Sequence, residues 1–150
     1  MNLATALAFP SCEWFRALAD RARGDAARYR RLGYSDVRLG LRIGDDGYVL
    51  EFRDFGDVDV SEWDRVRDDT STEGVDCVIR ASLDDWRALV EHIVANGHAD
   101  PNHTLNSLVL AGDRFVLEGD DQLGVDSFYR FNATIQALLD EAARVPTTLR

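Results

Sequence analysis

Residues 37–53 have the sequence VRLGLRIGDDGYVLEFR, and this stretch restricts the fold more than any other part of the chain. Apolar side chains alternate with polar or small ones on both sides of the turn 44–47, which is the two-residue period of strands with one buried face. A hairpin with this four-residue turn pairs Ile43 with Tyr48, Leu41 with Leu50, and Leu39 with Phe52. These six side chains share one wide apolar face, which helices or a second sheet must cover.

Three segments have the apolar spacing and end signals of covering helices. Residues 11–23 begin at a capping Ser11 and carry Trp14, Phe15 and Leu18 on one stripe. Residues 83–96 lie between a capping Ser82 and a terminating Gly97. The apolar spacing of residues 126–143 predicts a long closing helix. The stripes of the last two consist of Trp86, Leu89, Val90 and Ile93, and of Phe128, Phe131, Ile135, Leu138, Leu139 and Ala142.

The patterns of the remaining segments indicate short strands. Residues 75–81 alternate again, and residues 105–111 and 114–118 are expected to form two strands joined at Gly112-Asp113. Residues 57–74 are acidic and hydroxyl-rich, so we expect a short strand or turn followed by a mobile connection, with Trp63 and Val66 as its anchors. The expected order is helix, hairpin, strand, helix, hairpin, helix, an α/β (α+β) fold in a single domain over residues 1–150.

Composition narrows the class of protein. The chain has 150 residues, 45% of them apolar, and a net charge of −10, which disfavours nucleic acid and anionic membrane surfaces as partners. No stretch has the charged start of a secretory signal or the length of a membrane span, so stable membrane insertion is not expected. Cys12 and Cys77 are far apart and are expected to be small buried hydrophobes, which favours a reduced cytoplasmic location.

Three short motifs, in order, resemble one known family. They are DCVIRAS at 76–82, Asp85-Trp86 followed by Leu89, and LVLAGD at 108–113. Together with the Glu13-Trp14-Phe15 helix and the phenylalanine-rich closing helix, they resemble the sterol carrier protein type 2 family, also called the sterol-transfer domain. Each motif is short, so the ordered combination carries the resemblance.

The resemblance implies a five-stranded mixed sheet with helices on one face and a hydrophobic tunnel between the layers. The tunnel would take a sterol, a fatty acid or a fatty acyl-CoA, with no catalytic residue and no cofactor. We expect either the helix 126–143 or the loop 97–104 to move and admit the ligand. The residues expected to line the tunnel are Leu39, Leu41, Leu50, Phe52, Trp86, Leu89, Val90, Ile93, Phe128, Phe131 and Ile135.

The chain departs from the family pattern in two places. Asn106-Ser107 stand where the family tends to carry a small residue, usually glycine, so the start of that strand is expected to differ. The chain ends Thr148-Leu149-Arg150 rather than Ser-Lys-Leu, so peroxisomal import is not indicated.

The histidines raise the question of a metal site. His92, His98 and His103 lie close in sequence, with Asp100 among them. Imidazole and carboxylate are zinc ligands, but the spacing lacks the i, i+4 pattern that places two ligands on one helix face. We therefore predict solvated loop histidines and no metal.

Two other classes of function remain open. One is a small cavity enzyme, an isomerase or hydrolase, that uses a buried Asp113 or His92 as general base. The other is an accessory or dimerisation module for a partner enzyme, and a homodimer is compatible with the sequence. The carrier of an apolar molecule is the interpretation that we favour.

Overall fold

The computed structural model describes residues 5–63 and 74–150 and contains a five-stranded mixed sheet. Its strands lie in the spatial order β4-β3-β2-β5-β6; β2 and β5 are parallel and the other neighbours antiparallel. The predicted α/β class with a five-stranded mixed sheet is confirmed. The strands are β2 (Ser35–Ile43), β3 (Asp46–Asp54), β4 (Asp57–Glu62), β5 (Cys77–Ala81) and β6 (Val116–Glu118).

The β2–β3 hairpin forms as predicted, but its register differs by two residues. Ile43 pairs with Asp46, so the turn has only two residues, and Leu41 lies opposite Tyr48 and Leu39 opposite Leu50. Gly44, at φ +61°, occupies the first position of this tight turn, where a positive φ favours glycine. Because side chains alternate with period two, the shift leaves the same residues on the apolar face.

Helices α1 (Cys12–Arg23) and α3 (Leu83–Asn96) begin and end at the predicted signals. The hydroxyl oxygens of Ser11 and Ser82 accept hydrogen bonds from the backbone N–H groups of Trp14 and Asp85, each at 3.1 Å. Gly97 ends α3 in the left-handed conformation at φ +83°. Both caps therefore act as the sequence indicated.

The segment predicted as the first strand of a second hairpin is helix α4 (Leu105–Ala111), so that prediction is wrong. The hydroxyl of Thr104 caps it by accepting from the N–H of Ser107 at 3.1 Å, and Gly112 ends it at φ +74°. Its apolar residues also fit helical spacing, which a seven-residue segment does not distinguish from a strand. β6 consequently pairs with β5 and not with residues 105–111.

Several elements near the ends of the chain were not predicted. Helix α2 (Ala26–Leu32) follows α1, and β1 (Leu7–Phe9) pairs in parallel with β7 (Thr147–Leu149).

The closing helix α5 (Gln122–Asp140) begins four residues earlier than expected, and the 3₁₀ turn η1 (Glu141–Arg144) follows it. Most of the connection predicted within residues 57–74, including Val66, lies outside the described residues.

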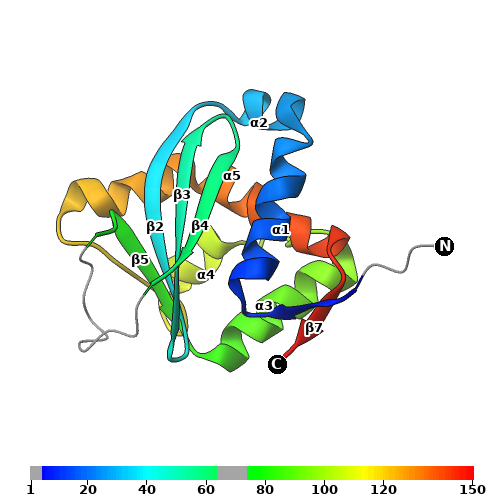
Figure 1. Ribbon diagram of the computed structural model, residues 1–150. Coiled ribbons are helices and arrows are strands. Elements are labelled where there is room, and N and C mark those ends of the chain that lie inside the picture. The colour runs from blue at the N-terminus through cyan, green and yellow to red at the C-terminus, as the bar shows by residue number, and fades with distance from the viewer. Residues whose placement is uncertain (1–4, 64–73) are drawn as a thin grey trace.

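The helices cover one face of the sheet, as Figure 1 shows. α1 packs against β4, α5 packs against β2 and β5, and α3 contacts η1. On the opposite face, the guanidinium of Arg42 stacks on the ring of Trp63 at 3.8 Å from its centroid. Gly40 lies under this ring, where a Cβ would come within 2.6 Å of it, so β2 requires a glycine there. Among the helices formed by the described residues, none is long and apolar enough to cross a membrane.

Candidate ligand-binding site

The predicted ligand-binding residues come from the sheet, α3 and α5, and all but one are buried. Phe131 is the exception, because it is only partly buried and packs against the rest. The others are at most 3% exposed: Leu39 and Leu41 on β2, Leu50 and Phe52 on β3, Trp86, Leu89, Val90 and Ile93 on α3, and Phe128 and Ile135 on α5. These side chains form what we call the interior layer, the apolar region between the sheet and its helices.

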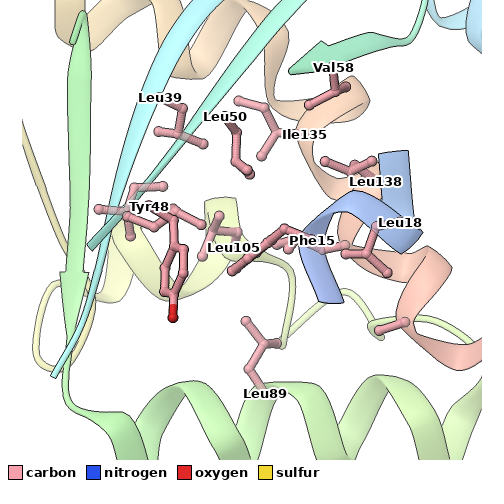
Figure 2. Close-up of a cluster of buried hydrophobic side chains, with 14 of the residues drawn as sticks. Phe15, Leu18, Leu39, Tyr48, Leu50, Val58, Leu89, Leu105, Ile135 and Leu138 are labelled. Carbon is pink, nitrogen blue, oxygen red and sulfur yellow. The ribbon is translucent and has the colours of Figure 1, made fainter. Parts of the chain in front are cut away.

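Figure 2 shows how side chains from separate elements meet in the interior layer. Leu39 and Leu50 extend from the sheet, Ile135 from α5 and Leu89 from α3 toward the same interior region. Leu39 and Leu50 are neighbours across the sheet, because they lie opposite each other in the β2–β3 register. The structure thus brings together residues that the sequence placed only on separate stripes.

Other residues share this region and were not among the predicted ligand contacts. Figure 2 labels Phe15, Leu18, Tyr48, Val58, Leu105 and Leu138 in the same cluster. Most of them lay on stripes that the sequence had already indicated. Leu105 was missed because its segment was assigned to a strand, although the spacing of Leu105, Leu108 and Val109 is that of a helix face.

Aromatic rings form much of the wall of the interior layer. Trp14 contacts both Phe9 and Phe15 edge-on, and the ring centroids of Phe15 and Tyr48 lie 5.0 Å apart. On α3, Trp86 meets Phe115 at 5.0 Å, and its indole N–H donates to the backbone carbonyl of Arg42 at 2.9 Å. This hydrogen bond fixes the orientation of a ring that is 1% exposed.

A few polar groups are buried among these apolar side chains. Burial raises the pKa of Tyr48 to about 12 and that of Cys77 to about 12, so both groups are neutral at physiological pH. Burial, with the Glu141 carboxylate as the next cause, also raises the pKa of Tyr29. Among the described residues, the buried Tyr29 hydroxyl has no hydrogen-bond partner.

Three cavities lie at the edges of the molecule and not among the predicted ligand residues. One of about 580 Å³ is lined by polar residues around Arg21, Arg28 and Glu141, and Glu141 is buried in ion pairs with both arginines. A second of about 300 Å³ lies between α2, α4 and α5, and a third of about 220 Å³ lies at the start of α5. None of the three is lined by a predicted ligand residue.

Comparison with solved structures identifies the fold. The crystal structure of sterol carrier protein 2 matches with a TM-score of 0.61 and 18% sequence identity, over 90% of this chain and 97% of that one. The chain has the sterol carrier protein 2 fold. A structure described as "UbiJ-SCP2 Ubiquinone synthesis protein" is also similar, with a TM-score of 0.48 and 19% identity over 91% of this chain and 90% of that one. No protein-family model and no curated protein matches the sequence.

The structural match confirms, at the level of fold, the resemblance stated from residues 76–82 and 108–113. In this sterol carrier protein 2-like chain, DCVIRAS includes β5 and ends at the cap of α3, as the alternation and Ser82 predicted. LVLAGD instead belongs to α4 and the turn after it. The three motifs therefore occur in the order that the resemblance rests on, although the secondary structure predicted for LVLAGD was wrong.

The structure places the two proposed catalytic bases in the turn after α4 and in the second half of α3. Asp113 is exposed in the turn after α4, so it is not the buried base that the enzyme interpretation requires. His92 lies near the end of α3 and contacts Asp100, with Nε2 3.5 Å from Oδ2. Its ring is also stacked on that of His103, with centroids 4.0 Å apart, and its Nδ1 lies 3.2 Å from Nδ2 of Asn96.

The structure also corrects the spacing argument about the histidines. Ligand atoms of His92, Asp100 and His103 all lie within 4.8 Å of one another. His98 is not in this group, and its Nδ1 lies 2.9 Å from the carbonyl oxygen of Ala99. The sequence pattern failed here because the loop turns back over the last turns of α3, which a helical spacing rule does not describe.

Proposed function

We propose that the chain binds an apolar small molecule, a sterol, a fatty acid or a fatty acyl-CoA, in the interior layer and carries it without chemical change. The observation that carries the proposal is the convergence of apolar side chains from β2, β3, α3 and α5 between the sheet and the helices. The sterol carrier protein 2 fold supports the same conclusion, because a protein named as a sterol carrier has this arrangement of layers.

The energetics favour moderate affinity. A ligand that buries roughly 400 Å² of apolar surface gains about 10 kcal/mol from transfer out of water. Immobilising the ligand costs at least about 4 kcal/mol. The net free energy is then about −6 kcal/mol at best, which corresponds to a Kd of roughly 40 μM, and opening the layer weakens binding further. Few polar groups line the layer, so selectivity among apolar ligands rests on shape.

We expect α5 or the loop 97–104 to move when the ligand enters, and hydrogen bonds connect α5 with this loop and with the start of α4. The backbone N–H of Ala99, in the loop after α3, donates to the Asp140 carboxylate of α5 at 3.0 Å. The N–H of Leu105, at the start of α4, donates to the side-chain oxygen of Gln136 of α5 at 2.7 Å. We therefore infer that α5 and the loop 97–104 move together when the layer opens.

Native mass spectrometry with matched variants tests the proposal. Palmitic acid and cholesterol are added separately, and Leu89→Ala and Ile135→Ala are compared with Leu110→Ala, whose side chain is 66% exposed on α4. We expect one bound ligand per chain, an affinity changed at least fivefold in both interior variants, and an unchanged affinity in Leu110→Ala. The same spectra report the oligomeric state.

Two outcomes would refute the proposal. One is the absence of any bound mass with either ligand while the protein stays folded by circular dichroism. The other is a bound ligand whose affinity is the same in the interior variants as in the Leu110 control, since that result would place the ligand on the surface.

A further inference from the structure

A cluster of three potential metal ligands lies where the loop after α3 folds back on the helix. His92 belongs to α3, and Asp100 and His103 to the loop that leads to α4. The ligand atoms of all three lie within 4.8 Å of one another, and the two imidazole rings are stacked with centroids 4.0 Å apart. We propose that His92, Asp100 and His103 form a binding site for a divalent transition metal ion such as Zn²⁺.

The residue types and the spacing suit this ion. Zn²⁺ binds imidazole nitrogen and carboxylate oxygen at about 2.0–2.2 Å, so tetrahedral ligand atoms lie roughly 3.4 Å apart. The observed limit of 4.8 Å exceeds this separation by little more than 1 Å. The His103 side chain is 48% exposed and is therefore free to rotate toward the other two ligands.

The backbone of the loop holds the carboxylate in place. One oxygen of Asp100, Oδ1, accepts from the N–H groups of Asn102 at 2.9 Å and His103 at 3.1 Å. The other, Oδ2, faces Nε2 of His92 at 3.5 Å. Because α5 also binds the loop through the Ala99 N–H, the position of Asp100 relative to α3 is fixed before any ion arrives.

The protonation states also suit an ion. Nε2 of His92 accepts a hydrogen bond from the backbone N–H of Asp100 at 3.1 Å, so this nitrogen is unprotonated, and its lone pair binds the ion when that hydrogen bond is given up. His103 Nδ1, which donates to Asp100 at 2.7 Å, loses its proton when the ion binds.

The surroundings leave space for water to complete the coordination. Three protein ligands with one open position are a common arrangement for Zn²⁺, and the partial exposure of Asp100 and His103 provides that position. The net charge of −10 raises the local concentration of cations around the whole chain. The alternative role of these three groups is an ion pair that anchors the loop to α3 without a metal ion. The experiment below distinguishes metal binding from this anchoring role.

Isothermal titration of Zn²⁺ into the tag-free full chain tests the proposal, with His98→Gln as the matched control. We expect one saturable site with a Kd in the micromolar range, weakened at least tenfold in His92→Gln and in His103→Gln and unchanged in His98→Gln. In NMR spectra, the ring signals of His92 and His103 shift on addition of Zn²⁺, whereas those of His98 do not. Cys12 and Cys77 are buried and do not compete in the folded protein.

Asp100→Asn provides a second, milder change. An amide oxygen still accepts from the N–H groups of Asn102 and His103, so the loop keeps its shape while the charged ligand is lost. We expect weaker Zn²⁺ binding with an unchanged melting temperature in EDTA. The absence of saturable binding up to about 1 mM Zn²⁺, or equal affinity in His92→Gln, His98→Gln and wild type, would show a loop-anchoring ion pair only and overturn the proposal.

Discussion

Replacing Leu50 by alanine tests whether the interior layer is packed as the structure shows. Leu50 is 1% exposed on β3, lies opposite Leu39 and Val60 on the neighbouring strands, and extends toward Ile135 of α5. Truncation removes fully buried apolar surface and leaves a cavity between two rigid elements. The expected loss of unfolding free energy is therefore about 3–5 kcal/mol, the upper part of the range for buried leucines.

Urea unfolding followed by circular dichroism measures this loss. The midpoint should fall while the slope m stays constant, because the same surface is exposed on unfolding. Leu110→Ala, at a side chain that is 66% exposed, is the control and should change the free energy by no more than about 0.5 kcal/mol. A loss below about 1 kcal/mol for Leu50→Ala would mean that the layer is loosely packed, contrary to the structure.

Three further predictions concern single groups. Tyr29→Phe removes a buried hydroxyl without a partner among the described residues, so the unfolding free energy should stay constant or rise by up to about 1 kcal/mol in urea titrations; a clear loss would contradict this. Burial raises the pKa of Cys77 from 9.0 to about 12, so its contribution to stability is complete below pH 9 and is lost as the pH rises toward 12. Cys77→Ala should therefore reduce the fall in unfolding free energy between pH 9 and pH 11, and an equally steep fall would count against the burial of the thiol. Ser82→Ala removes the cap of α3 and should cost about 1 kcal/mol in thermal or urea unfolding, whereas no change would mean that the cap is not formed.

Features with local causes were predictable from the sequence. The caps at Ser11 and Ser82 and the apolar alternation of the hairpin depend on residues a few positions apart, and all of them are present in the structure. The predicted register of the hairpin was wrong, because alternation alone does not fix the length of the turn. Gly44, with its positive φ, allows a turn shorter than the predicted one. Helix α4 was missed because seven residues are too few to separate a period of 3.6 from a period of two.

Features that depend on distant residues were not predictable in this way. The pairing of Leu7 with Thr147 joins the two ends of the described chain, and no local pattern indicates it. The contact of His103 with His92 likewise depends on the path of the loop, which hydrogen bonds to Asp140 and Gln136 of α5 determine. For the interior layer, the sequence identified most of the buried side chains, but only the structure shows which of them face one another.

A methyl-labelled NMR experiment with palmitic acid shows whether an apolar molecule binds between the sheet and the helices. We predict intermolecular contacts between the acyl chain and the methyl groups of Leu39, Leu50, Leu89 and Ile135, and none with the exposed Leu110 and Leu123. Contacts confined to the exposed leucines, or unchanged methyl spectra at saturating ligand, would contradict it.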